Sequence, residues 1–213
     1  VPSSCVGGVG GVEETELSEQ DNVVEIGTGW GGFAIYAAKN DGCRVTTTTI
    51  SQQQYNLAEE RIKQAGLEDK ITLLLNDYRD LQKNYAGSFD KLVSIEMIEA
   101  VGWKFYDTFF SHCSSLLKPE GIALIQAITI ADQRYDQARK DVDFIQRYIF
   151  PGSCIPSITA LVSASTKASD FSLIQAQDFG SHYARTLKKW HEVFNAKSEE
   201  VSALGYSYDF KRM

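Results

Sequence analysis

A glycine-rich stretch at residues 23–33, with the sequence VVEIGTGWGGF, constrains this chain more than any other part. An apolar run that contains Glu25 comes first, and an alanine-rich pattern of helical type follows the glycines. This order predicts a strand, a tight turn and a helix. Glycine lets the backbone turn sharply and lets a ligand lie against it, and the first N–H groups of a helix have no partner within it. The four glycines of the turn are Gly27, Gly29, Gly31 and Gly32.

Composition excludes several classes of protein. The 213 residues are enough for one domain with a substantial core. A formal net charge of −7 argues against nucleic acid as a partner and against a global attraction to an anionic membrane. The sequence has no apolar run of the roughly 18 to 20 residues that a spanning helix needs, and its start lacks the order of a signal peptide. We expect a cytoplasmic location.

The cysteines and histidines form no pattern typical of a metal site. The four cysteines are widely scattered, without the two-residue spacing of a zinc knuckle, and the three histidines show no paired spacing. Scattered cysteines are typical of free thiols in a reducing compartment. The sequence therefore predicts no metal.

Apolar runs alternate with helical patterns along most of the chain. Each run is nearly continuous or β-branched, as in parallel strands that are buried on both faces. We therefore predict an α/β fold, with a mostly parallel sheet and helices on both faces. Ser51 is the expected cap of the second helix and Gly66 its expected end. Strands are predicted at residues 23–26, 44–50, 71–75, 89–95, 121–130 and 171–177, with a turn at 118–121, and helices at 32–39, 52–65, 105–117 and 181–198.

The same pattern divides the chain. Residues 1–20 are rich in glycine and poor in large apolar side chains, which predicts a flexible N-terminal arm. Residues 21–213 form the predicted domain. The alternation stops after the fifth strand, and residues 132–169 are interpreted as a lid-like insertion above the sheet. No strand is predicted after residue 177, so we expect the sheet to lack a final strand.

Candidate site residues follow the strands, because ligands of open parallel sheets bind beyond the carboxyl ends of the strands. A P-loop is excluded, since no Gly-Lys-Ser/Thr follows the turn, and an NAD site would require an acidic residue where this chain has threonines and glutamines. Glu99 leaves two readings open: a residue that caps the next turn, or a carboxylate at the mouth of the crevice. The candidates at the strand ends are Glu25, Thr49, Ser51, Gln54, Asp77, Tyr78, Glu96, Glu99, Gln126 and Ile128.

Several motifs together resemble one family. They are VVEIGTGWGGFAIYAA, TTTISQQQ, LNDYRDL, SIEMIEAVG, QAITI, FIQRYIFPGSCIPS and HYARTLKKW. They cover about residues 17–213 and look like the cyclopropane-fatty-acyl-phospholipid synthase family of S-adenosylmethionine-dependent methyltransferases. The glycine motif alone indicates only a methyltransferase, whereas EMIEAVG and YIFPGSCIPS are specific to this group. The resemblance implies a Rossmann-like class I methyltransferase fold.

The resemblance also implies cofactor-binding residues. Glu25, Gly27, Thr28, Gly29 and Gly31 lie in the loop that wraps the methionine part of S-adenosylmethionine in the family. Thr49 and Gln54 match positions around the ribose. Asp77 and Tyr78 match the turn beside the adenine.

The implied reaction is methyl transfer to a cis double bond of a phospholipid acyl chain, followed by proton loss that closes a cyclopropane ring. The family uses a bound bicarbonate ion as the base. Glu99 and Tyr183 match two residues that hold it, and Ile128 belongs to the same group. Gln126 stands where the family usually has histidine, and its amide still provides an N–H donor. Cys5 matches a family cysteine only weakly, because it lies too close to Gly27.

The implied partners are unsaturated phospholipid acyl chains, reached through peripheral contact with a membrane, and a homodimer is left open. The insertion near residues 149–158 and the N-terminal arm are the two candidates for membrane contact. Three functions stay open at this point. They are ring formation, methylation of a lipid or small molecule without ring closure, and a non-catalytic remnant that binds the cofactor.

Overall fold

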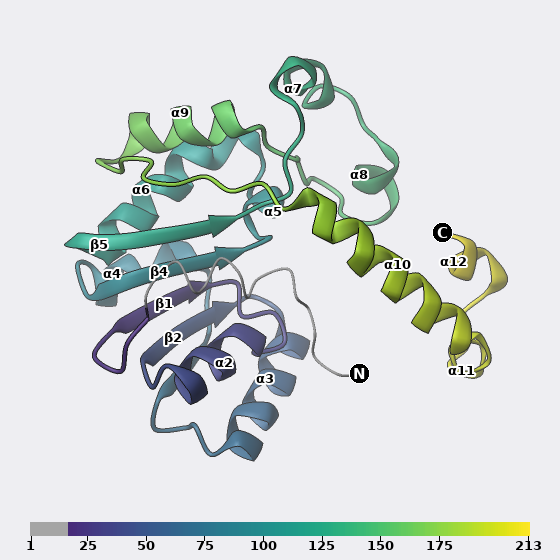
Figure 1. The fold of residues 1–213 in the computed structure, drawn as a ribbon, viewed down its shortest axis with the longest axis horizontal. Helices are drawn as coiled ribbons and strands as arrows, with labels where there is room; N and C mark the ends of the chain where they lie inside the picture. The colour runs from purple at the N-terminus through teal and green to yellow at the C-terminus, as the bar shows by residue number, and fades with distance from the viewer. Residues whose placement is uncertain (1–16) are drawn as a thin grey trace. The chain divides into compact units, whose positions relative to one another are not determined.

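The computed structural model describes residues 17–213, so the arm predicted at 1–20 and the Cys5 position lie largely or wholly outside the described part. The chain divides into two compact units. One unit ends at Ile174 and contains the sheet, and the other consists of Gln175–Met213. Each is treated by itself below (Figure 1).

A parallel sheet of five strands forms the centre of the first unit, in the order β3-β2-β1-β4-β5. The prediction of a parallel α/β sheet is confirmed. The order reverses between β1 and β4, because the chain first builds outward through β2 and β3 and then returns to the other side of β1. A ligand crevice forms at such a reversal, beyond the carboxyl ends of the strands. The strands are β1 (Asn22–Ile26), β2 (Arg44–Thr49), β3 (Ile71–Leu75), β4 (Phe89–Ile95) and β5 (Leu117–Gln126).

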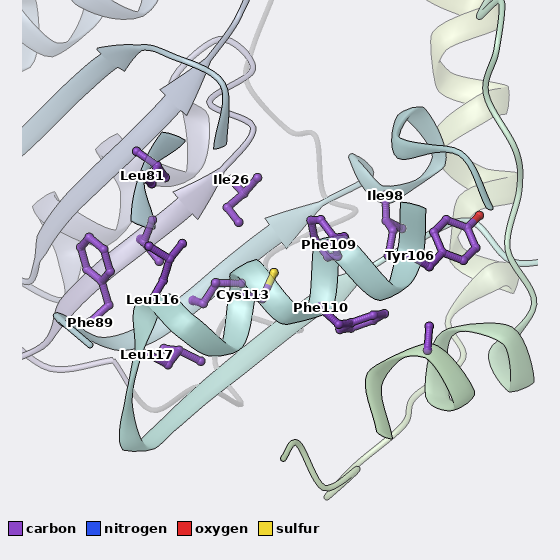
Figure 2. Close-up of a cluster of buried hydrophobic side chains, with 13 residues drawn as sticks. Ile26, Leu81, Phe89, Ile98, Tyr106, Phe109, Phe110, Cys113, Leu116 and Leu117 are labelled. Atoms are coloured by element: carbon purple, nitrogen blue, oxygen red, sulfur yellow. The ribbon is translucent and has the colours of Figure 1, made fainter. Parts of the chain in front are cut away.

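Alternate side chains of each strand enter two separate cores. Val24 of β1 and Leu92 of β4 face one cluster, whereas Val23 and Val93 face the other. Successive side chains of a strand point to opposite faces, so each buried strand supplies both layers. The first cluster is covered by α6 (Tyr106–Leu116), which contributes Phe109, Cys113 and Leu116 (Figure 2). The second cluster is covered by α2 (Gly32–Asn40), which contributes Ala34 and Ala37. Cys43, between α2 and β2, belongs to the same cluster.

The helix signals read from the sequence are found where they were expected. Ser51 caps α3 (Gln52–Ala65) by accepting a hydrogen bond from the Gln54 N–H, and Gly66 ends it with a φ of 65°. The hydroxyl group pairs an N–H that has no partner inside the helix, and glycine adopts the left-handed conformation without strain. This cap lies directly after β2, so it helps to fix the carboxyl end of the sheet.

Short helices connect β3, β4 and β5. Residues after β3 form η1 (Tyr78–Asp80) and α4 (Gln82–Tyr85), and residues after β4 form α5 (Ile98–Val101) and η2 (Trp103–Phe105). The region predicted as an insertion contains α7 (Asp132–Ala138), α8 (Phe144–Tyr148) and α9 (Ile158–Ala168). Of these, α9 packs against α6, and its Ala164 and Leu161 contact the first core cluster.

The sixth strand predicted at residues 171–177 is wrong. Residues 170–179 form neither helix nor strand. A strand needs a partner for its N–H and C=O groups, and β5 pairs with β4 alone in the described sheet. Phe171 still packs against the first cluster, but Leu173 and Ile174 are exposed.

The boundaries of β5 also differ from the prediction. The strand begins at Leu117 and ends at Gln126, four residues before the predicted end. The predicted turn at residues 118–121 is an irregularity inside the strand, where the pairing with β4 shifts between Phe89 and Lys91. Gly121 is required there, since a Cβ atom on it would lie 2.9 Å from Leu117 Cβ.

The second unit consists of helices. The long helix predicted at 181–198 is found as α10 (Gly180–Ala196), and it is followed by α11 (Ser198–Ala203) and α12 (Tyr208–Arg212). Within α10, the ring of Tyr183 packs edge-on against the ring of Trp190, with ring centroids 6.1 Å apart. Across residues 17–213, no helix has the length and apolar character needed to cross a membrane.

Candidate active site

The glycine turn is anchored to the neighbouring strand. The N–H groups of Gly27 and Thr28 both donate to the carbonyl oxygen of Thr48, at 3.1 and 3.0 Å, and Gly31 N donates to Thr28 O at 2.9 Å. Gly27, Gly29 and Gly31 have φ values of 100°, 52° and 81°, a region that other residues disfavour. The turn therefore requires glycine for its shape.

The three glycines differ in what surrounds them. A Cβ atom on Gly27 would lie 3.2 Å from Met97 Cγ, and one on Gly31 would lie 3.3 Å from Ala58 Cβ. A Cβ atom on Gly29 would meet nothing within 4 Å. Gly27 and Gly31 therefore permit close packing, whereas Gly29 leaves one side of the turn open to a ligand.

Glu25 is buried behind this turn. Its Oε2 accepts a hydrogen bond of 2.6 Å from the Thr47 hydroxyl, which lies 2.7 Å from the Thr28 hydroxyl. Burial raises the pKa of Glu25 to about 8, although the Thr47 hydrogen bond lowers it. A buried carboxyl with a raised pKa is ready to lose its proton when a cation binds beside it.

The candidates after β2 hold one another in place. Thr49 Oγ1 lies 2.7 Å from Gln54 Oε1 and donates to it, and Ser51 N donates to Thr49 Oγ1 at 3.1 Å. Thr49 is buried and Gln54 is half-buried. The pair presents a polar edge next to the glycine turn, because β2 is the neighbour of β1.

Asp77 and Tyr78 follow β3, and their side chains already have partners. Both oxygens of Asp77 accept from the Arg79 guanidinium, at 2.9 and 2.6 Å, and this contact lowers the pKa of Asp77. The ring of Tyr78 packs edge-on against Phe109, and burial raises the pKa of Tyr78 to about 12. The partly buried Tyr78 side chain therefore packs against the core under α6.

Glu99 lies in α5, between the ends of β4 and β5. Its Oε1 accepts a hydrogen bond of 2.6 Å from Ile128 N, and its carbonyl oxygen accepts one of 2.8 Å from Cys154 N. Its Oε2 is buried and has no hydrogen-bond partner among the described residues. Burial raises the pKa of Glu99, the Ile128 hydrogen bond lowers it, and the nearby Glu96 raises it. Because burial is the largest of these causes, the pKa of this half-buried carboxyl lies above its ordinary value.

Gln126 ends β5, two residues before Ile128. Its Nε2 lies 3.2 Å from Glu96 Oε1, and its carbonyl oxygen accepts from Glu96 N at 2.9 Å. Glu96 has a φ of 49°, the one positive value outside glycine in the described part of the chain. The sequence places Glu96 at the end of β4 but contains no signal for this backbone conformation.

Sequence reasoning also missed Tyr106. This buried side chain on α6 donates from its hydroxyl to the carbonyl oxygen of Cys154 at 3.0 Å, and Figure 2 shows its oxygen pointing away from the Phe109 ring. Burial raises the pKa of Tyr106. Because Cys154 N is bonded to Glu99, Tyr106 fixes the segment that holds the Glu99 backbone. Nothing in the sequence distinguished Tyr106 from the other aromatic residues of this predicted helix.

The glycine turn lies against the segment that carries Glu99. Met97, whose side chain would press on a Cβ at Gly27, stands two residues before Glu99. This part of the structure thus combines an open glycine turn, the buried Glu25, and Glu99 bonded to the N–H of Ile128 just after β5. Tyr183 belongs to the other unit, on α10, and its role beside Glu99 stays a prediction.

Comparison with known proteins shows which family this chain belongs to. The sequence model of the family described as mycolic acid cyclopropane synthetase matches residues 11–213. The chain belongs to this family. The resemblance to cyclopropane synthases that the motifs indicated is confirmed.

Relatives in this mycolic acid cyclopropane synthetase family are similar along nearly the whole chain. The cyclopropane-fatty-acyl-phospholipid synthase of Escherichia coli strain K12 is 41% identical over 202 residues, which are 94% of this chain and 49% of that protein. The tuberculostearic acid methyltransferase UfaA1 of Mycobacterium tuberculosis is 36% identical over 197 residues, 92% of this chain and 45% of that protein. The chain thus spans about half the length of these curated relatives.

Solved structures confirm the class I methyltransferase fold. The cyclopropane synthase MmaA2 of Mycobacterium tuberculosis superposes with a TM-score of 0.81 at 23% identity, covering 95% of this chain and 72% of that one. The mycolic acid cyclopropane synthase CmaA1, described in complex with SAH and CTAB, gives a TM-score of 0.83 at 24% identity with the same coverage.

Proposed function

We propose that this chain transfers a one-carbon unit from S-adenosylmethionine to the cis double bond of an unsaturated acyl chain in a phospholipid, forming a cyclopropane ring. The observation that carries the proposal is Glu99, which lies between the ends of β4 and β5 with one oxygen bonded to Ile128 N and the other buried without a partner among the described residues. The identity of 41% to the Escherichia coli cyclopropane-fatty-acyl-phospholipid synthase supports it.

The residues of the glycine turn fit S-adenosylmethionine. The cofactor supplies a methyl group activated by its sulfonium charge. Gly29 leaves open space on the turn, and the buried Glu25 can offset the positive charge of the cofactor's amino acid part. Thr49 and Gln54 provide the polar edge for the ribose. CmaA1, a family member of known structure, was solved with the demethylated cofactor, which is consistent with this assignment.

The residues around Glu99 fit a bound bicarbonate ion as the base. A carboxyl that keeps its proton donates to an anion, whereas two bare anions would repel each other. The raised pKa of Glu99 therefore favours the role, and one N–H of Gln126 adds a second donor. Tyr183 is proposed as a further member of this set, from the resemblance. The role of these residues is to hold the base beside the carbon that loses its proton.

Apolar side chains on the insertion offer an entry for the acyl chain. Phe144, Tyr148 and Phe150 are 50%, 55% and 63% exposed, and Arg147 lies over the Tyr148 ring at 5.6 Å. Aromatic rings with a basic neighbour are typical of protein surfaces that lie in the interface of a bilayer. We propose that this face, defined as residues 142–150, contacts the phospholipid bilayer from which the substrate comes, as a lid-like insertion would. Peripheral membrane association is part of the proposal.

The test is an incubation with labelled S-adenosylmethionine and vesicles of unsaturated phospholipid. We expect an acyl chain that is heavier by one methylene and contains a ring. Cofactor binding without any labelling of lipid would contradict the proposal and favour a non-catalytic role.

A second candidate function is C-methylation without ring closure. The similarity to the tuberculostearic acid methyltransferase UfaA1 favours it. The same incubation separates the two, since mass spectrometry of fragmented acyl chains distinguishes a ring from a methyl or methylene branch.

A further inference from the structure

Glu96 occupies an unfavourable backbone conformation at the end of β4. Its φ of 49° lies in the left-handed region, which glycine, asparagine and aspartate enter more readily than glutamate. Residues held in such a conformation cluster at functional sites, where contacts around them keep them in place. Contacts of the Glu96 side chain are therefore expected to hold the residue in this conformation.

That side chain is bonded to Gln126. Glu96 Oε1 accepts from Gln126 Nε2 at 3.2 Å, and Glu96 N donates to the Gln126 carbonyl oxygen at 2.9 Å. Ile95, the residue before Glu96, is in register with Gln126 across β4 and β5. The left-handed turn at Glu96 is what brings both its N–H and its carboxylate to the same partner.

A carboxylate can only accept hydrogen bonds, whereas a side-chain amide has one accepting and one donating end. Glu96 therefore selects the rotamer of Gln126 in which the NH₂ group faces it. One of the two side-chain N–H hydrogens of Gln126 is donated to Glu96. The second N–H and the side-chain oxygen Oε1 remain for a ligand. With no acceptor at position 96, the amide is free to rotate by half a turn and exchange its donor for its acceptor.

The adjacent bond from Ile128 N to Glu99 Oε1 completes the pattern. Two glutamates from the segment after β4 each hold one residue from the end of β5. Glu99 holds the backbone of Ile128, and Glu96 holds the side chain and backbone of Gln126. Both bonds join the segment that carries Glu99, whose Oε2 has no partner among the described residues, to the end of β5 and the residues just after it.

We propose that Glu96 is a positioning residue, which orients the amide of Gln126 so that its free N–H donates to the anion held beside Glu99. This inference rests on the proposed function. It explains why glutamate is present at a position whose backbone favours glycine.

The experiment compares Glu96→Gly, Glu96→Ala and Glu96→Gln in the lipid assay, with hydrogencarbonate added back to buffer depleted of carbon dioxide. Glycine and alanine remove the acceptor, and we expect a loss of roughly 10- to 100-fold in kcat together with a higher hydrogencarbonate concentration for half-maximal rate. Glutamine retains an acceptor oxygen, so we expect its kcat within about threefold of the original. The dissociation constant of S-adenosylhomocysteine should stay unchanged in all three variants.

Thermal unfolding separates positioning from simple stabilisation. Glycine relieves the left-handed strain, so Glu96→Gly should unfold at the same or a higher temperature while its turnover falls. Glu120→Gln, at the opposite end of β5, is the control and should change neither quantity.

An unchanged kcat in Glu96→Gly, or a loss in Glu96→Gln as large as that in Glu96→Gly, would overturn the positioning role. A lack of product from the unsubstituted protein would instead count against the proposed function. The unsubstituted protein could also form normal product at a rate that does not depend on hydrogencarbonate. This result would overturn the proposal that Gln126 binds the anion.

Discussion

Glu99 Oε1 lies 2.6 Å from Ile128 N, and this hydrogen bond joins the segment after β4 to the end of β5. The other carboxyl oxygen of Glu99 is buried without a partner in residues 17–213. One oxygen thus holds the side chain in position, while the other has no hydrogen-bond partner among these residues. A group arranged in this way can be changed without moving the glycine turn.

The first prediction concerns Glu99→Gln. Glutamine keeps an oxygen that accepts from Ile128 N. Its amide NH₂ group replaces the second carboxyl oxygen, so the side chain can no longer carry an acidic O–H. We expect the dissociation constant of S-adenosylhomocysteine, measured by calorimetry, to change little, and kcat to fall by roughly 100-fold. Equal losses in cofactor binding and turnover would contradict the assigned role. Glu68→Gln, on the exposed surface, is the matched control.

The second prediction concerns Gly29→Val, which should abolish cofactor binding in a folded protein. The valine side chain would occupy the open face of the turn, where no heavy atom lies within 4 Å of the Cβ position. The left-handed backbone adds roughly 1–2 kcal/mol of strain. Calorimetry with S-adenosylhomocysteine measures the binding, and circular dichroism checks the fold.

Gly87→Val provides the control for that strain. Gly87 has a φ of 61° and equally open surroundings, but it precedes β4 at the opposite end of the sheet. The two variants should lose similar stability, and only Gly29→Val should lose the cofactor. Loss of binding in both would show that backbone strain, rather than a blocked site, causes it.

The third prediction is a pH dependence of stability that comes from Glu25. Its pKa is about 8 in the folded protein, against 4.5 as the ordinary value, so the folded state holds one more proton than the unfolded chain between these two pH values. The free energy of unfolding of the cofactor-free protein therefore falls as pH rises through this window, by up to about 1.4 kcal/mol per pH unit from this group.

Glu25→Gln removes that contribution. Denaturant unfolding at several pH values in the window should show a shallower decline for the variant than for the unsubstituted protein. The difference between the two slopes isolates Glu25, because every other titrating group is common to both. Equal slopes would mean that Glu25 is ionised in the folded protein across the whole window.

The fourth prediction concerns the face formed by residues 142–150. The double substitution Phe144→Ser and Phe150→Ser should weaken binding to vesicles of unsaturated phospholipid by about tenfold or more, since burying one such side chain contributes about 1.5–3 kcal/mol. Cosedimentation measures it. Tyr36→Ser, a 38% exposed residue on α2, should bind as the unsubstituted protein does. Unchanged binding by the double variant would exclude this face as the membrane contact.

The parallel sheet could be predicted because each strand carries its own signal. The run at residues 89–95 predicted β4 with the bounds that the structure has, and Ser51 marked the start of α3. The segment at 171–177 has a similar apolar pattern and forms no strand. A strand depends on a pairing partner distant in the sequence, and a local pattern contains no information about whether that partner is present.

The candidate site could be predicted in its residue types and only partly in its contacts. Glu25 and the glycines were expected at the cofactor, and Glu99 and Ile128 were grouped by the resemblance. The hydrogen bond between Glu99 and Ile128, the left-handed conformation of Glu96 and the Tyr106 contact to Cys154 depend on tertiary packing. Asp77 was expected beside the adenine. In the structure its carboxylate accepts a hydrogen bond from the Arg79 guanidinium, a contact that was not predicted from the sequence.

The two cores each contain a buried thiol, Cys43 in the cluster that α2 covers and Cys113, on α6 itself, in the other cluster. Burial raises the pKa of both thiols, that of Cys43 to about 11, so neither is a reactive thiolate while the protein is closed. A thiol-specific reagent would modify each cysteine only when its own layer opens. The modification rates of Cys43 and Cys113, resolved by peptide mapping, would therefore show whether the two faces of the sheet open together or one before the other.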